Sequence, residues 1–168
     1  MATVTVIGID PGSQHTGFGI VRASRGVMEL VDCGVIHTGT NKEFSERLCT
    51  IYRELSQVLT RYTPQEAAIE QVFVSQNAQS ALKLGQARGV AVAACAQHNL
   101  TISDYSATQV KKALVGAGHA EKTQVAFMVK TMLKINEAKW ALDTSDALGL
   151  ALCHLTMRQF QYSLQRSM

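Results

Sequence analysis

The feature that most constrains the fold is a change in the spacing of apolar residues at Phe44. Before it, short turns rich in Gly and Ser separate three apolar runs with β-strand character, at residues 3–10, 17–23 and 28–38. From Phe44 to Tyr62 the apolar side chains recur at steps of three and four, which is the spacing of an amphipathic helix. We therefore expect a three-stranded meander followed by a helix.

The rest of the chain alternates between strand and helix patterns. Thr40 and Glu43 have the spacing of a capping box before the first helix, and Pro64 follows its end. Then come a short buried strand "AAIEQV" at 67–72, a helix at 77–99, a strand at 100–106, and helices at 107–114, 121–135 and 144–159. This order predicts an α/β fold on a mixed sheet. A right-handed crossover would place the 67–72 strand parallel to the first strand and beside it.

Length and composition predict one domain. The 168 residues, of which 46% are apolar and 17% charged, can form one ordinary core, over residues 1–160, with a poorly ordered tail at 161–168. No stretch approaches the roughly 20 apolar residues of a membrane span, and the N-terminus lacks a secretion signal, so we expect a cytoplasmic protein. Cys33, Cys49, Cys95 and Cys153 lack the spacing of a metal site or a disulfide framework. We expect them to be reduced core thiols.

Charge is distributed unevenly along the chain. Residues 1–82 carry six basic and eight acidic side chains, whereas residues 83–139 carry eight basic and three acidic ones. A cationic second half suits a face that binds a polyanion, because each Lys or Arg that meets a phosphate releases a counterion. A solvated helical surface explains the same pattern equally well.

Four acidic residues are candidates for a shared site. Asp10 and Glu70 would lie near the carboxyl ends of neighbouring parallel strands, where α/β sheets carry their sites. Asp143 and Asp146 are three residues apart at the start of the last helix, so both can point to one side. A cluster of carboxylates suits Mg²⁺ or Mn²⁺, and two ions roughly 3.5–4 Å apart would activate water and stabilise the leaving oxygen in phosphodiester cleavage.

Three of these acids have structural explanations as well. Asp10 before Pro11 and Gly12 could simply favour a tight turn. Asp143 could cap the last helix, and Asp146 suits its first turn through the helix dipole. Glu70 is different, because an acid within a short apolar strand has no turn or capping role and is costly if unpaired. Glu70 is therefore the strongest candidate.

Four motifs, in this order and spacing, resemble one family over nearly the whole chain: "GIDPGSQHTGFGI", "AIEQVFVSQNAQSALKLGQARGVA", "QVKKALVGAGHAEKTQV" and "DTSDALGLALCH". This is the RuvC family of bacterial Holliday-junction resolvases. The resemblance implies an RNase H-like three-layer fold, with helices around a five-stranded mixed sheet whose first three strands are antiparallel. It also implies a homodimeric, divalent-metal endonuclease that resolves four-way DNA junctions by symmetric nicks, in recombination and repair. The catalytic, metal-binding acids of the family fall on Asp10, Glu70, Asp143 and Asp146.

The resemblance also assigns DNA contacts and partners. The family's junction-contacting aromatic falls on Phe73, and two basic residues near the scissile phosphate fall on Lys111 and Lys122. Without the resemblance, Phe73 would be taken as a core residue and the lysines as surface residues. Gln76 departs from the family, since relatives often carry a basic residue there. The implied partners are a four-way junction and the branch-migration complex RuvA and RuvB.

Cutting two strands of a four-way junction calls for two sites, which a C₂ homodimer supplies. The segment at 81–96, "ALKLGQARGVAVAACA", is apolar around much of its circumference, so it predicts either a dimer interface or core packing. Two other functions fit parts of the pattern. One is an actin-like or sugar-kinase-type ATP-binding domain, which needs two lobes where this chain has room for one. The other is a non-catalytic junction-binding protein, which the presence of all four acids disfavours.

Overall fold

The computed structural model describes residues 3–71, 77–135 and 144–167. Its strands are β1 (Val4–Asp10), β2 (His15–Ser24), β3 (Val27–His37), β4 (Glu66–Glu70) and β5 (Thr101–Tyr105). Its helices are α1 (Phe44–Tyr62), α2 (Ala78–Gln97), α3 (Ala107–Val115), α4 (Lys122–Leu133) and α5 (Ser145–Ser167).

The five strands form one mixed sheet in the order β3-β2-β1-β4-β5. The pairs β1–β2 and β2–β3 are antiparallel, whereas β4 is parallel to both β1 and β5. The predicted fold class is therefore confirmed, including the antiparallel first three strands and the crossover that places β4 beside β1.

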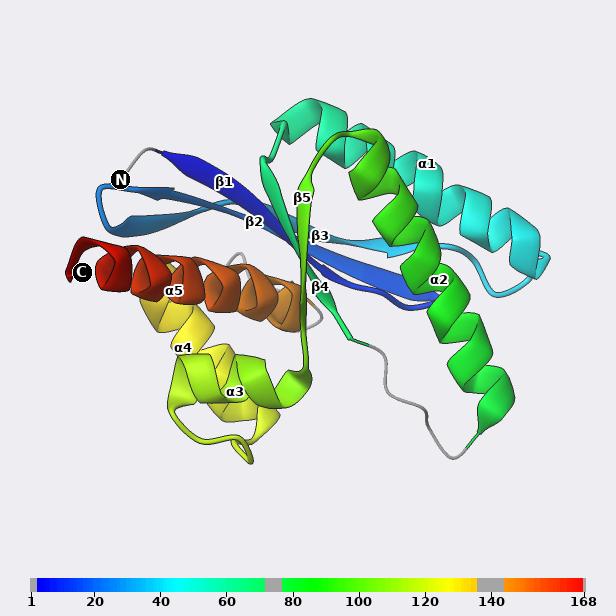
Figure 1. Cartoon of the computed structure of the whole chain (residues 1–168). Coiled ribbons are helices and arrows are strands. Elements are labelled where there is room, and N and C mark those ends of the chain that lie inside the picture. Colours follow the sequence, from blue (N-terminus) through cyan, green and yellow to red (C-terminus); the bar gives the residue numbers. More distant parts are fainter. Residues whose placement is uncertain (1–2, 72–76, 136–143, 168) are drawn as a thin grey trace.

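The sheet is the middle of three layers (Figure 1). In β1, Ile7 and Ile9 pack in one cluster with residues of α1 and α2, while Val4 and Val6 pack in another with residues of α3, α4 and α5. Alternate residues of a strand face opposite sides, so β1 is buried on both faces, as its almost wholly apolar sequence predicts. By the same alternation Asp10 shares the α5 face with Val4 and Val6.

Helix α5 lies directly on the backbone of β1 and β2. Gly8 and Gly19 are paired across these strands. A Cβ atom added to Gly8 would lie 1.9 Å from the carbonyl oxygen of Ala147, and one added to Gly19 would lie 2.6 Å from Leu148 Cδ2. The two glycines therefore permit the close approach that places the first turn of α5 beside the end of β1.

The predicted first helix, from Phe44 to Tyr62, is confirmed, but its predicted capping box of Thr40 and Glu43 is wrong. Glu43, rather than Thr40, is the N-cap of α1, and it makes no side-chain capping bond. The predicted end of the last helix at Gln159 is wrong, and α5 continues to Ser167. No Pro or Gly interrupts the sequence after Gln159, so nothing local ends the helix.

The cysteines are free, as expected, but not all of them are in the core. Cys95 and Cys153 are buried, and burial raises the pKa of their thiols to about 12 and about 11. Cys33 is half-buried and Cys49 is exposed on α1, so the prediction of a core position is wrong for Cys49. Within the described part of the chain, every helix is too short or too polar to cross a lipid bilayer.

Candidate active site

Asp10 and Glu70 meet at the carboxyl edge of the sheet. They are the last residues of β1 and β4, and the parallel register that pairs Ile9 with Ile69 brings the next residue of each strand to the same level. Both side chains are half-buried and hydrogen-bonded to each other. The sequence prediction that these two acids lie side by side is therefore correct.

This pair of carboxyl groups keeps a proton at higher pH than an isolated carboxyl group does. Burial, the charge of Asp10 and the hydrogen bond to Asp10 raise the pKa of Glu70 to about 7, with a further increase from Asp146. Burial and the charge of Asp146 also raise the pKa of Asp10, although the hydrogen bond from Glu70 acts in the opposite direction. The protonated Glu70 carboxyl thus donates to the Asp10 carboxylate, as expected for two acids in contact.

Asp146 and Lys122 complete the charged group. Asp146 lies in the first turn of α5, and its Oδ2 atom is 2.7 Å from Nζ of Lys122, the first residue of α4. A cation at a helix N-terminus is opposed by the helix dipole, so propensity does not explain Lys122 there. Its positive charge lowers the pKa of both Asp10 and Glu70. The positive charge of Lys122 thus partly neutralises the negative charge of the three acids.

A hollow of about 210 Å³ opens beside these groups. Glu70, Asp146, Lys111 and Lys122 contribute its polar wall, and the remaining lining residues are Ala107, Val110, Val125 and Leu150. Lys111 reaches this hollow from α3 and Lys122 from α4. The two predicted basic residues therefore share one hollow with two of the predicted acids. Phe73, Gln76 and Asp143 lie outside the described residues.

A second polar group, which sequence analysis missed, lies on the same side of the sheet. Nδ1 of His154 on α5 is 2.8 Å from the Tyr105 hydroxyl, and its Nε2 is 2.6 Å from Oε2 of Glu66. Nε of Arg158 donates to the other Glu66 oxygen at 3.0 Å. These hydrogen bonds connect α5 to β4 and β5. Their only sequence signals are the four-residue spacings of Glu66 with Glu70 and of His154 with Arg158.

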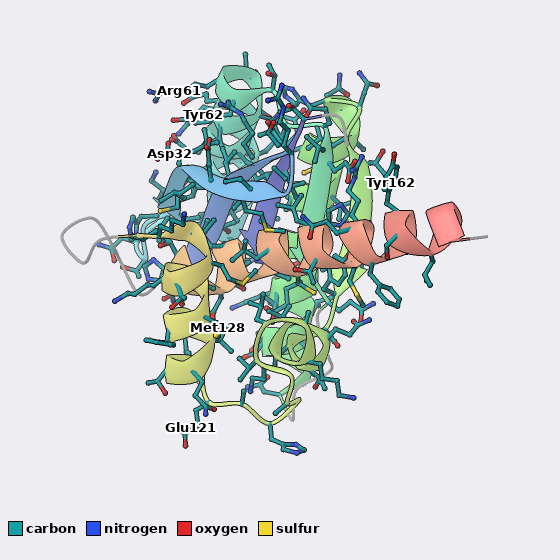
Figure 2. All side chains as sticks on the ribbon, turned by 90° about the vertical axis from the view of Figure 1, so that its left-hand side faces the viewer. Asp32, Arg61, Tyr62, Glu121, Met128 and Tyr162 are labelled. Atoms are coloured by element: carbon teal, nitrogen blue, oxygen red, sulfur yellow. The ribbon has the colours of Figure 1, made fainter. Side chains whose placement is uncertain are left out.

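Another hollow, of about 490 Å³, lies between β3 and α1. Asp32, Arg61 and Tyr62 line it, and the Tyr62 hydroxyl donates a hydrogen bond to the Asp32 carboxylate. Figure 2 shows these three residues at the end of the molecule opposite Glu121 and Met128 of the α4 region. Neither Asp10 nor Glu70 lines this hollow, so it is separate from the acidic site.

The donor chemistry of the acidic site suits a hard cation. Asp10, Glu70 and Asp146 offer only carboxylate oxygens, the ligands that Mg²⁺ and Mn²⁺ prefer. Over residues 3–71, 77–135 and 144–164, no three Asp, Glu, His or Cys side chains are already gathered as a metal site. Asp146 instead pairs with Lys122, and Glu70 with Asp10. Burial and the repulsion from Asp10 and Asp146 raise the pKa of Glu70, and a bound cation would relieve the repulsion.

Comparisons with known proteins show the family of the chain. Residues 6–154 match the family model described as crossover junction endodeoxyribonuclease RuvC. The protein of that name from Lawsonia intracellularis is 55% identical over 158 residues, which cover 94% of each chain. The solved structure of Thermus thermophilus RuvC in complex with a Holliday junction substrate superposes with a TM-score of 0.87 at 34% identity, over 94% of this chain and 96% of that one.

A more distant likeness concerns the fold alone. The yeast mitochondrial Holliday junction resolvase Ydc2 has a TM-score of 0.66 at 12% identity, over 97% of this chain and 84% of that one. A mixed sheet in this strand order, with acids at the ends of β1 and β4 and at the start of the covering helix, defines the RNase H-like class of nucleases. Within that class, the chain belongs to the RuvC family of crossover junction endodeoxyribonucleases. The actin-like ATP-binding alternative is thereby set aside.

Proposed function

We propose that this protein resolves four-way DNA junctions by paired symmetric nicks, through metal-dependent hydrolysis of phosphodiester bonds. The observation that carries the proposal is the meeting of Asp10 and Glu70 at the ends of two adjacent parallel strands, with Asp146 close enough to raise the pKa of both. A purely structural acid in such a place would need a cationic partner in direct contact, as Glu66 has in Arg158. The side-chain hydrogen-bond partner of Glu70 is another acid, Asp10.

The proposed cofactor is Mg²⁺, with Mn²⁺ as a substitute and two ions per site. Asp10, Glu70, Asp143 and Asp146 would hold the ions, which supply an activated water and stabilise the leaving oxygen. To serve as ligands, Glu70 would lose its proton and Asp146 would move away from Lys122. Both changes are favoured by the positive charge that the ions bring.

The basic residues of the hollow act on the DNA backbone. Lys111 and Lys122 lie on different helices and line the same hollow as Glu70, so both can reach one phosphate placed there. As point charges they offset the negative charge that develops on the phosphate oxygens. Phe73 is proposed to stack on an unpaired base at the crossover, where stacking is worth about 1–3 kcal/mol. The products are 5′-phosphate and 3′-hydroxyl ends.

We also propose that the protein acts as a homodimer that pairs through α2. The buried side of this helix consists of Ala87, Ala91, Ala94 and Cys95. The opposite side exposes Leu82, which is 64% accessible, and in line with it Gly85, Gly89 and Ala93. An added Cβ atom at Gly85 or Gly89 would meet no atom within 4 Å. This apolar, small-residue face suits close contact with a second copy of the helix.

Family membership supports a proposal for the wider setting. We propose a single nuclease domain over residues 1–160 that acts in the cytoplasm on junctions delivered by the branch-migration proteins RuvA and RuvB. The Thermus thermophilus relative, which was solved with a Holliday junction substrate, supports junction DNA as the substrate here.

The direct test is cleavage of a synthetic four-way junction with and without Mg²⁺, resolved on a denaturing gel. Wild-type protein is expected to give paired nicks at symmetric positions only with the metal. Glu70→Gln keeps the size of the side chain but removes the metal-binding charge, so we expect cutting to fall by at least about a thousandfold. Its binding to the junction, measured by gel shift, should stay within about twofold. A Glu70→Gln variant that cuts at the wild-type rate would refute the assignment.

A further inference from the structure

Arg88 is held between the end of β4 and the end of β5. Its Nε atom donates a hydrogen bond to the backbone carbonyl of Glu70 at 3.1 Å. Its Nη2 atom lies 2.6 Å from Oδ1 of Asp104, the penultimate residue of β5. The Arg88 side chain is 25% exposed, and it extends from α2 on the opposite side of the sheet from α5. One guanidinium therefore joins a helix and two strands.

The carbonyl that Arg88 holds belongs to the central acid of the site. Glu70 is the last residue of β4, and the next backbone amide, that of Gln71, donates to the carbonyl of Tyr105 at 2.9 Å. The sheet pairing of β4 ends at this point. The orientation of the Glu70 backbone is thus fixed by the β5 neighbour and by Arg88. Because the side chain of Glu70 extends from this backbone, a change in the peptide plane shifts its carboxyl group.

The geometry of the contact favours arginine over lysine. A guanidinium is planar and presents Nε and Nη2 donors in a fixed fork, so one group can meet two acceptors at once. Charge-assisted hydrogen bonds of this kind are about twice as strong as neutral ones. A lysine could pair with Asp104, but its single ammonium lacks the fork that bridges to the Glu70 carbonyl. Replacing Arg88 by lysine therefore keeps the positive charge but removes the contact that orients Glu70.

We propose that Arg88 is a positioning residue that sets the orientation of Glu70 and links it to α2. The proposal rests on the proposed function, since it assigns Arg88 a part in the same site. It also gives a physical connection between the helix that we propose as the dimer interface and the acid that we propose as a metal ligand. Arg88 itself does not line the hollow beside the acids.

The test compares Arg88→Lys with wild type, and with Arg53→Ala as a matched control. Arg53 forms an exposed ion pair with Glu54 on α1, remote from the acids, so its loss should leave cutting unchanged. Three quantities are measured: the single-turnover cutting rate at saturating enzyme, the junction Kd by gel shift without metal, and the Kd for Mn²⁺ by calorimetry without DNA. Sedimentation shows whether each variant keeps the oligomeric state of the wild type.

For Arg88→Lys we expect the cutting rate to fall by at least about tenfold, because small misplacements of reacting groups cost one to two orders of magnitude. The Mn²⁺ Kd should rise several-fold, while the junction Kd stays within about twofold. Arg88→Ala should lose the same activity and regain part of it in millimolar guanidinium, with methylammonium as the inactive control. Rescue of this kind separates a positioning role from a general loss of folding.

Three outcomes would overturn the proposal. One is a normal cutting rate in both Arg88 variants, and another is a junction Kd that weakens in parallel with the rate, which would make Arg88 a DNA contact. The third is a loss of activity without any rescue by guanidinium and without any change in Mn²⁺ affinity. If wild-type protein itself fails to cut junctions with Mg²⁺, the proposed function fails instead, and the Mn²⁺ Kd still reports on Arg88.

Discussion

Glu66 and Glu70 lie on the same face of β4, yet folding moves their pKa values in opposite directions. Burial acts to raise both. At Glu66 the hydrogen bond from His154 and the charge of Arg158 outweigh burial, so its pKa is lowered. At Glu70 the neighbours Asp10 and Asp146 add to burial, and the pKa rises to about 7. Glu66 is thus a paired structural acid, whereas Glu70 belongs to a site that favours added positive charge.

The Glu66 pairing predicts how stability depends on pH. A carboxyl group with a lowered pKa in the folded state contributes stability above its ordinary value of 4.5, and this contribution is lost as the pH falls through the lowered pKa. We expect Glu66→Gln to destabilise the protein at pH 7, and the difference from wild type to shrink as the pH falls below about 4.5. Urea unfolding from pH 3 to pH 7 measures this. His154, Arg158 and Tyr105 are the groups that face Glu66.

Glu54→Gln is the control for this series. Glu54 pairs with Arg53 on the exposed side of α1, and exposed pairs contribute little to stability. Its difference from wild type should stay small and flat over the same pH range. A Glu66→Gln difference that is equally flat would show that the pairing adds no pH-dependent stability.

Sequence could identify the acids but not their partners. Glu70 was recognisable because a lone acid inside "AAIEQV" has no local explanation, and Asp10 because its strand was predicted next to that of Glu70. The ion pair of Lys122 with Asp146, the network around His154 and the contact of Arg88 with the Glu70 carbonyl join residues that only the tertiary fold brings together. The single sequence signal for Arg88 is a charged residue within the small-residue run "LGQARGVAV".

At the scale of elements, the position of α5 decides whether the acids meet. The helix carries Asp146 at its start and packs on β1 and β2 where Gly8 and Gly19 leave room. Periodicity predicted most of the elements well, because strands of period two and helices of period 3.6 have local signatures. The distance between α5 and the sheet has no such local signature. A glycine in a strand indicates that some neighbour can approach closely, but it does not indicate which one.

Gly8→Ala tests this packing. The new Cβ atom would lie 1.9 Å from the Ala147 carbonyl oxygen and 2.8 Å from the Ala151 backbone nitrogen, and a backbone cannot move aside as a flexible side chain can. We expect a loss of about 3 kcal/mol in the free energy of unfolding. Denaturant unfolding measures it.

Gly149→Ala serves as the matched control on α5. Its added Cβ atom would lie 3.4 Å from Val110 Cγ1, an ordinary contact distance, so stability should change by no more than about 1 kcal/mol. Equal effects of the two substitutions would show that the backbone of α5 does not contact Gly8 of β1 closely.

At the scale of the whole molecule, α2 has one buried face and one exposed face. One face packs on α1 and the sheet, and the other exposes Leu82, Gly85, Gly89 and Ala93. The sequence left open whether the apolar segment at 81–96 served the core or an interface. The structure shows that one side of this segment packs in the core, while an apolar stripe on its other side stays exposed in the single chain. Periodicity could not separate the two, because apolar residues surround much of the helix.

The substitution Gly85→Leu tests whether the exposed face of α2 is a dimer interface or is only solvated. In a free helix, replacing Gly by Leu favours the helical state by roughly 0.8–1 kcal/mol. At a close helix contact the larger side chain forces the two copies apart. We expect the dimer Kd, measured by sedimentation, to rise at least about tenfold, while the unfolding temperature of the monomer does not fall. Thr60→Leu on the exposed side of α1 should leave the dimer intact. A Gly85→Leu variant that dimerises normally would move the interface elsewhere.

The central claim is that acids from β1, β4 and α5 form one metal site. It is tested most directly by anomalous diffraction from crystals of the wild-type protein soaked in Mn²⁺. We predict manganese peaks bounded by the carboxylates of Asp10, Glu70 and Asp146, with Lys122 moved away from Asp146, and no such peaks in Glu70→Gln crystals under the same soak. Strong manganese binding elsewhere, with Asp10, Glu70 and Asp146 left without an ion, would contradict the account.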